Sequence, residues 1–242
     1  MKSLKVDFKE DIMIGIIGAM SVEVEGLKSK ITDAKSEIVC GAEYVSGKLC
    51  GKDVVVAQCG VGKVFASVCA STMILKYNVS AIINTGVAGT LVSFLNILDF
   101  AVSSFVIQHD MDTTAIGDAP GLISGINIVE IPASRRLSSL ALNIATEQGT
   151  ACARGVIASG DQFISSQEKK DYIRETFGAI ACEMEGAAIG HVCYLADVEF
   201  IVIRCISDSA TGDAEMEYPE MVSRAAVKSE ALVLAMLEAM ED

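Results

Sequence analysis

Phe200-Ile-Val-Ile-Arg204-Cys-Ile-Ser207-Asp208 is an apolar run that ends in a hydroxyl and a carboxylate. Val- and Ile-rich runs of this length are typical of strands that are buried on both faces, as in sheets covered by helices. An ionised acid at the end of such a strand is costly unless it is paired or hydrogen-bonded. Acids kept in such places often serve proton transfer or binding. The run therefore predicts a buried strand of an α/β fold with a functional acid at its end.

Six further apolar runs alternate with helical patterns along the chain, at residues 12–17, 54–58, 81–85, 101–107, 153–158 and 180–183. The spacing of apolar residues predicts helices at 63–77, 134–148, 165–177, 184–195 and 217–240, the third opened by the capping-box pattern Ser165-Ser-Gln-Glu168. We expect one α/β domain at 12–242, with a central twisted, mostly parallel or mixed sheet flanked by helices. Residues 1–11 are polar and form a short N-terminal extension.

The composition excludes several classes of function. A formal net charge of −13 argues against binding to nucleic acid or to an anionic membrane surface. No apolar run reaches the ~20 residues of a membrane-spanning helix. The eight cysteines lie far apart without a CxxC pair and there are two histidines, so we expect reduced thiols, a cytoplasmic protein and no metal site.

Short polar or glycine-containing segments follow the expected strands. In open α/β sheets, ligands bind beyond the carboxyl ends of the strands, so these segments should converge on one site. They are Gly18-Ala-Met20, Cys59-Gly-Val-Gly62, Thr85-Gly-Val-Ala-Gly89, Ser159-Gly-Asp-Gln-Phe163, Glu183-Met-Glu185 and Ser207-Asp208. The phosphate-loop, dinucleotide and nucleophile-elbow patterns are absent from them.

Taken together, these motifs resemble the 5′-methylthioadenosine/S-adenosylhomocysteine nucleosidases of the purine nucleoside phosphorylase-like superfamily. The resemblance runs from about Met13 to Leu237. It implies an enzyme of methionine salvage and amino-acid biosynthesis that cuts the glycosidic bond of both nucleosides with water. The products would be adenine and a 5-thio-substituted ribose. It implies no cofactor and no metal, and a homodimer acting on a small nucleoside.

The resemblance also assigns the chemistry. Asp208 would protonate purine N7 as the general acid, with Ser207 orienting it, and Glu23 would activate the attacking water as the general base. Glu185 would bind the ribose hydroxyls. Because it lies at the start of an expected helix, the helix dipole should favour its anionic form.

The remaining implied contacts surround the nucleoside. Phe163 would stack on the adenine, the Ile164 backbone would bind its polar edge and Met184 would pack under the ribose. Arg204 and Glu183 would position Glu23, the water and the sugar. The alkylthio pocket would comprise Met20, Val61 and Tyr218, with Thr113 and Ile116 from the partner subunit.

The chain departs from the family pattern at two positions. Val87 stands where some members have Ser near the ribose, and Leu98 stands where Gly is common. Leu98 would be strained if its backbone requires a positive φ. Neither change removes the acid or the base.

Other functions remain open from sequence. A phosphorylase of the same fold is disfavoured because Glu23 would repel phosphate and Asn84 and Val87 stand where such enzymes carry Arg and Ser. A hydrolase of another nucleoside, such as futalosine, would use the same residues. A non-catalytic nucleoside-binding module would not need both Glu23 and Asp208.

Overall fold

The computed structural model describes residues 13–208 and 218–240, with the side chains of the last segment described from residue 220. The expected extension at 1–11 lies outside these residues. All seven expected strands and all five expected helices are present, with ends that differ by a few residues. The elements, in chain order, are β1 (Met13–Gly18), α1 (Ser21–Ser29), β2 (Thr32–Val39), β3 (Ala42–Leu49), β4 (Lys52–Gln58), α2 (Lys63–Tyr77), β5 (Ala81–Thr90), β6 (Phe100–Gln108), η1 (Thr114–Ile116), β7 (Ile131–Pro132), α3 (Arg135–Glu147), β8 (Cys152–Ser159), α4 (Gln167–Phe177), β9 (Ala179–Glu183), α5 (Gly186–Ala196), β10 (Glu199–Asp208) and α6 (Tyr218–Ala239).

The strands form one mixed sheet. β5 pairs with β10, β10 with β6, β6 with β8, β8 with β9 and β9 with the end of β5, so these strands close into a ring. β1, β4, β3 and β2 extend from β5 in that order. The pairs β1–β4, β1–β5, β5–β10, β6–β8 and β8–β9 are parallel, and the other pairs are antiparallel. The sheet is therefore mixed, and parallel pairing does not dominate it.

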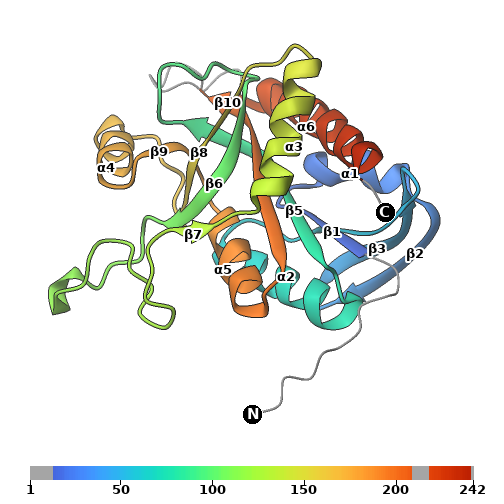
Figure 1. Ribbon diagram of the computed structural model, residues 1–242, viewed down its shortest axis with the longest axis horizontal. Helices are drawn as coiled ribbons and strands as arrows, with labels where there is room; N and C mark the ends of the chain where they lie inside the picture. Colours follow the sequence, from blue (N-terminus) through green and yellow to red (C-terminus); the bar gives the residue numbers. More distant parts are fainter. Residues whose placement is uncertain (1–12, 209–217, 241–242) are drawn as a thin grey trace.

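Helices cover both faces of the sheet, as the continuous apolar strands predict (Figure 1). Alternate residues of β10 show why, because Val202 packs in the cluster with α2 and α5 while Ile203 packs in the cluster with α1, α3 and α6. A strand points successive side chains to opposite faces, so both faces of this strand are buried. Arg204 is only 1% exposed and lies on the same face of the strand as Val202.

The hairpins β2–β3 and β3–β4 are absent from the sequence prediction. Their turns are Cys40-Gly41 and Cys50-Gly51, and all four residues have positive φ, as type I′ turns require. Cysteine rarely adopts this conformation, so the usual Asn-Gly signal is missing. β2 is also mostly exposed and polar, which hides its pattern.

Three local expectations differ from the structure. α1 was not predicted, and it carries Glu23. The expected capping box of α4 is wrong, since its N-cap Ser166 makes no side-chain capping bond. Met184 precedes α5 and does not belong to it.

Leu98 does adopt a positive φ of 71°. Within residues 13–208 and 218–240, every helix is too short or too polar to cross a bilayer.

Candidate active site

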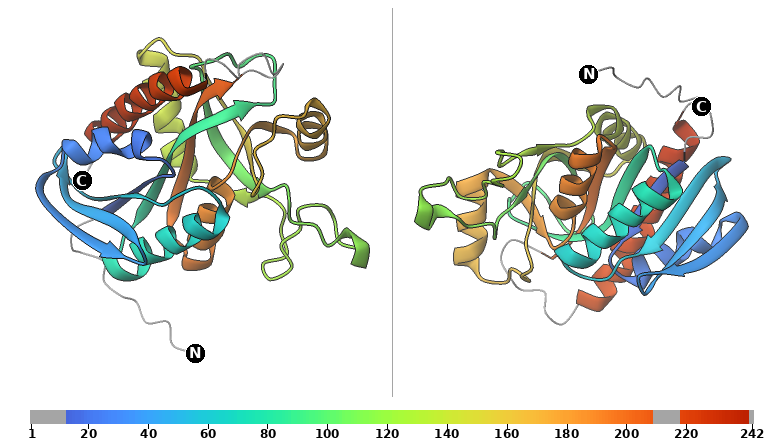
Figure 2. Two further views of the ribbon diagram at one scale, coloured as in Figure 1. Left: turned by 180° about the vertical axis from the view of Figure 1, so that it is seen from behind. Right: turned by 90° about the horizontal axis from the view of Figure 1, so that it is seen from below.

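A cavity of about 240 Å³ lies where the carboxyl ends of the strands meet. Each of the six segments expected to converge contributes to its wall, which confirms that prediction. Its lining comprises Ala19, Met20, Glu23, Val61, Val87, Ala88, Gly89, Phe163, Cys182, Glu183, Met184, Glu185, Ser207 and Asp208. Three strands of the ring, β5, β9 and β10, contribute lining residues directly. Figure 2 shows the course of the chain from two further sides.

Glu23 is held by backbone N–H groups. Its Oε2 accepts hydrogen bonds from the N–H groups of Ala19 at 2.7 Å and Met20 at 2.9 Å, and its Oε1 accepts one from Val87 at 3.1 Å. Glu23 is the third residue of α1, so its bond to the N-cap Met20 is half of a capping box. Burial raises the pKa of Glu23, while Arg204 and these three N–H groups act against that rise. The result is a fixed carboxylate whose basicity is increased.

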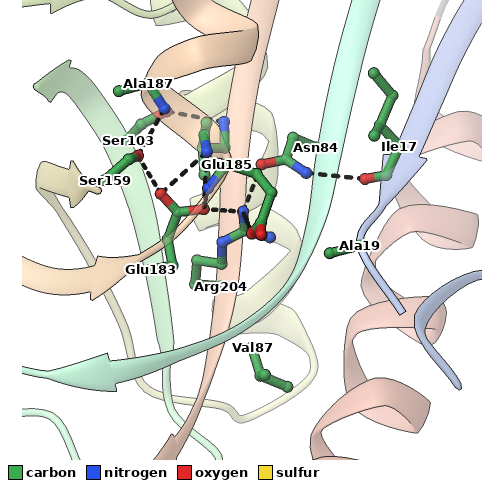
Figure 3. Close-up of polar contacts among 12 residues, drawn as sticks. Ile17, Ala19, Asn84, Val87, Ser103, Ser159, Glu183, Glu185, Ala187 and Arg204 are labelled. Atoms are coloured by element: carbon green, nitrogen blue, oxygen red, sulfur yellow. Dashed lines mark hydrogen bonds and ion pairs between the residues drawn. The ribbon is translucent and has the colours of Figure 1, made fainter. Parts of the chain in front are cut away.

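Arg204 is buried, does not line the cavity, and anchors a polar network that includes the lining acids Glu183 and Glu185 (Figure 3). Its Nη2 donates to Glu183 Oε2 and to Asn84 Oδ1, the latter at 2.6 Å. Asn84 in turn donates to the carbonyl of Ile17 at 2.9 Å. Burial opposes the charged guanidinium, but the acids Glu183, Glu185 and Glu23 raise the pKa of Arg204 overall. Arg204 therefore stays cationic beneath three carboxyl groups.

Glu183 caps α5. Its carboxylate accepts hydrogen bonds from the N–H groups of Glu185 and Gly186 at 2.8–3.0 Å. Ser159 donates its hydroxyl to Glu183 and accepts the N–H of Ala187 at 2.7 Å. The start of the helix thus stabilises Glu183 and not Glu185.

Glu185 projects its carboxyl group towards the cavity. Its Oε1 accepts the N–H of Gly62 at 2.9 Å, and its Oε2 lies 3.6 Å from Arg204. Burial and then the neighbouring Glu183 raise the pKa of Glu185 to about 7. Burial and Glu183, which occupies the helix N-terminus, therefore act against the anionic form of Glu185 that the helix dipole was expected to favour. Glu185 can exchange a proton near neutral pH and can still accept a hydrogen bond.

Asp208 has few partners by comparison. Ser207 Oγ donates to its Oδ1 at 3.2 Å, and Lys170 Nζ lies 3.8 Å from its Oδ2. A Cβ at Gly89 would come within 2.8 Å of Oδ2, so this position needs a residue without a side chain. Burial raises the pKa of Asp208, and Lys170 and Ser207 oppose the rise. A carboxyl group in such a place can hold a proton and release it to a base in the cavity.

The apolar wall suits a flat ring and a sugar. Phe163 is 65% exposed and lines the cavity with Met184, Met20 and Val61. Ile164 is buried and lines a smaller adjoining cavity of about 40 Å³. An aromatic ring that lines a cavity can stack on a planar ligand.

Two expected contacts, Thr113 and Ile116, are not part of this wall in the same chain. Thr113 donates its hydroxyl to Asp118 at 2.7 Å, and Ile116 is 81% exposed. Both belong to the segment around η1, which extends away from the sheet (Figure 1). Tyr218 opens α6, and its side chain lies outside the described residues. Of the residues expected around the alkylthio group, Met20 and Val61 therefore line the cavity, and Thr113 and Ile116 of the same chain do not.

Several site residues were not assigned roles from sequence. Ser159 and Asn84 stood in expected motifs but without a function, and Gly62 contributes only its backbone N–H. Lys170 is buried beside Asp208. From sequence alone, a lysine in the first turn of a polar helix is expected to be solvated. Only the arrangement in space reveals these partners.

The arrangement places three carboxyl groups of raised pKa on the wall of one cavity, and two of them, Glu23 and Asp208, come from separate elements, α1 and β10. Such a pair can divide acid and base work between two atoms of one substrate. No group of His, Cys, Asp and Glu residues among the described ones could hold a metal ion.

Comparison with known proteins shows what this chain is similar to. The family model described as the phosphorylase superfamily matches residues 13–238. A 5′-methylthioadenosine/S-adenosylhomocysteine nucleosidase of Shewanella is 40% identical over 226 residues, which cover 93% of this chain and 98% of that protein.

Two solved structures share the fold. One is a Helicobacter pylori nucleosidase mutant with 5′-methylthioadenosine in the active site, with a TM-score of 0.91, 35% identity and coverage of 96% of this chain and all of that one. The other is a futalosine hydrolase of Helicobacter pylori, with a TM-score of 0.89, 35% identity and coverage of 95% and 98%.

Proposed function

The chain belongs to the phosphorylase superfamily and, within it, to the 5′-methylthioadenosine/S-adenosylhomocysteine nucleosidases, and we propose that it hydrolyses the glycosidic bond of these two nucleosides. The products are adenine and the 5-thio-substituted ribose. The observation that carries the proposal is the pair of cavity carboxyls, Glu23 and Asp208, whose pKa values burial raises in both cases.

Asp208 acts as the general acid. Its proton moves to N7 of the purine, and the electrons of the glycosidic bond move into the base, which leaves as neutral adenine. Ser207 orients the carboxyl through its hydroxyl. A proton held at neutral pH by burial suits this role.

Glu23 acts as the general base. It holds a water molecule against the anomeric carbon and takes a proton as the ribose gains oxocarbenium character. Its three backbone N–H partners fix the carboxylate, and the Arg204 network lies beneath it. Glu185 accepts hydrogen bonds from the ribose hydroxyls, and Glu183 positions Arg204 and the start of α5.

Phe163 stacks on the adenine, the Ile164 backbone reads its polar edge and Met184 packs under the ribose. Met20 and Val61 form the start of the alkylthio pocket. The prediction that Tyr218 belongs to it falls on a side chain outside the described residues.

Water is favoured over phosphate as the nucleophile by the charges of the site. Glu23, Glu183 and Glu185 surround a single guanidinium, that of Arg204. A phosphate dianion would meet uncompensated negative charge there. To test the reaction, methylthioadenosine is incubated with the protein with and without phosphate. Free methylthioribose in both samples supports hydrolysis, and a sugar 1-phosphate contradicts it.

Futalosine is the second candidate substrate, because a futalosine hydrolase shares this fold over nearly the whole chain. The same acid and base would serve it. Comparing kcat/KM for methylthioadenosine, adenosylhomocysteine and futalosine decides between them, and we expect the first two to be preferred.

We further propose a cytoplasmic homodimer in which Thr113 and Ile116 close the partner's alkylthio pocket. The support is an exposed apolar patch beside the cavity, formed by Val61, Val64, Phe65 and Val68. All eight cysteines are free, which suits a reducing compartment.

Light scattering and an Ile116→Ala variant test the assembly. Ile116→Ala should weaken methylthioadenosine by roughly 1–3 kcal/mol and adenosine, which lacks the thioether tail, much less. A fully active monomer, or equal losses for both nucleosides, would exclude this role of the loop.

A further inference from the structure

Lys170 is a lysine in an unusual place. It lies in the first turn of α4 and is only 3% exposed, whereas the adjacent Lys169 is exposed and bonds Gln162. Lysine is almost never fully buried unless its charge is compensated. Its Nζ lies 3.8 Å from Asp208 Oδ2, and both side chains are largely shielded from solvent, at 4% and 18% exposure.

The cavities show on which side of Asp208 this lysine lies. Asp208 lines both the large cavity and the small adjoining one. Lys170 lines only the small cavity, while Glu23 and Glu185 line only the large one. The ammonium group of Lys170 therefore approaches Asp208 from the small cavity, and Glu23 and Glu185 face Asp208 across the large one.

The other groups around Asp208 are neutral or negative. Ser207 donates a hydrogen bond from the same strand, and Cys182 and Glu183 of β9 line both cavities with it. Glu23 and Glu185 lie further round the wall of the large cavity. None of these described groups could stabilise a negative charge on Asp208 as an ammonium can.

We propose that Lys170 is a positioning residue that orients Asp208 and stabilises its carboxylate after the proton has moved to the purine. The inference rests on the proposed role of Asp208 as the general acid. In the step, the O–H bond of Asp208 breaks and an N7–H bond forms, while the electrons of the glycosidic bond move to the base. Lys170 gives up no proton in this step, and the proton lost by the attacking water goes to Glu23.

The ammonium has two opposing effects on the acid. It makes Asp208 a stronger proton donor, because the carboxylate product is stabilised. It also lets Asp208 ionise at a lower pH than burial alone would allow. Removing the charge should therefore slow proton transfer and, at the same time, keep the acid protonated to higher pH.

The test is the pH profile of kcat/KM for methylthioadenosine in Lys170→Met and Lys170→Gln, which remove the charge with different packing demands. In whichever variant folds, the alkaline limb should move up by about one pH unit or more, and the plateau of kcat should fall by roughly threefold to tenfold. Lys170→Arg should restore both, and Lys169→Met should match the wild type.

A second readout does not depend on turnover. Adenine accepts the Asp208 proton at N7, so its binding should weaken as pH rises through the pKa of Asp208. In Lys170→Met this weakening should shift to higher pH, as followed by calorimetry.

A purely structural role would lower the plateau without moving either pH dependence, and that result would overturn the inference. An equal shift in Lys169→Met would overturn it too. These outcomes differ from failure of the proposed function, in which the wild-type protein itself would neither cleave methylthioadenosine nor bind adenine.

Discussion

Glu23 and Asp208 line the same cavity, but the protein holds them in different ways. Glu23 is 4% exposed and accepts hydrogen bonds from three backbone N–H groups in two segments of the chain. Asp208 is more accessible, and its described contacts are a hydroxyl and a distant ammonium. Burial raises the pKa of both acids.

The difference teaches what each acid can do. A carboxylate that accepts several N–H groups is fixed in place and kept ionised against the effect of burial, so it is ready to take a proton. A carboxyl group with few donors keeps its proton more easily and can turn towards a ligand. Hydrogen bonds from the backbone therefore suit Glu23 to accept a proton. The smaller number of donors around Asp208 suits it to hold a proton and give it up.

The largest expected effect comes from removing the base. Glu23→Gln keeps the shape and one acceptor oxygen but cannot take a proton, so kcat should fall by about 10³-fold or more, within the usual range for such groups. Binding of methylthioadenosine should change little. Glu25→Gln, an exposed acid two residues further along α1, is the control. Lost binding with retained turnover at saturation would make Glu23 a substrate ligand instead.

Removing the acid should cost somewhat less. Asp208→Asn keeps a hydrogen-bond donor for N7 but has no transferable proton, so kcat should fall by about 10²-fold. The Kd for methylthioadenosine should change only modestly. Asp197→Asn is the control, because Asp197 is exposed and its left-handed conformation suits asparagine. Near-normal turnover would remove Asp208 from the acid role.

Glu185, the third cavity acid of raised pKa, should affect how the free energy of unfolding depends on pH. Its folded pKa of about 7 exceeds the ordinary 4.5, so the folded state binds more protons than the unfolded state between these values. The free energy of unfolding should therefore fall as pH rises from about 4.5 to 7. Glu185→Gln should flatten this dependence and stabilise the protein at pH 8 by roughly 2 kcal/mol, while weakening nucleoside binding.

Denaturant unfolding at pH 5 and pH 8 measures that change. Glu147→Gln, an exposed acid at the end of α3, should leave the dependence as in the wild type. A Glu185→Gln protein with an unaltered pH dependence would show that Glu185 is ionised in the folded state.

The smallest effect is expected at Val87. It holds Glu23 through its N–H and not through its side chain. Val87→Ser keeps that N–H, so kcat should change by less than about threefold and the acidic limb of the pH profile should stay in place. A moved limb would mean that the valine side chain itself sets the environment of the base.

Much of the fold could be predicted from the sequence because its central strands are buried on both faces. Continuous apolar runs identified β1, β4, β5, β6, β8, β9 and β10, and Lys63–Tyr77 was predicted to the residue. β2 and β3 could not be found, since an exposed polar strand and Cys-Gly turns carry little local signal.

In the site, too, the residues that could be predicted are those with a clear local sequence pattern. Asp208 at the end of β10 and Glu23 in the helix that follows β1 could be placed at one cavity because topology brings those strand ends together. Their roles as acid and base came from the family resemblance and stay predictions. Glu185 could be placed at the cavity but not given its protonation, which depends on Glu183 taking the helix N-terminus. Lys170 could not be found, because only packing decides whether a lysine is solvated or buried.

The central claim is that Glu23 delivers water to the face of the ribose opposite the base that Asp208 protonates. The anomer of the first-formed sugar tests this claim most directly, by rapid proton NMR of methylthioadenosine cleavage in phosphate buffer. Because the substrate is a β-nucleoside, attack from the opposite face predicts free α-methylthioribose, which then equilibrates with the β-anomer. Initial formation of the β-anomer, or of a sugar 1-phosphate, would contradict it.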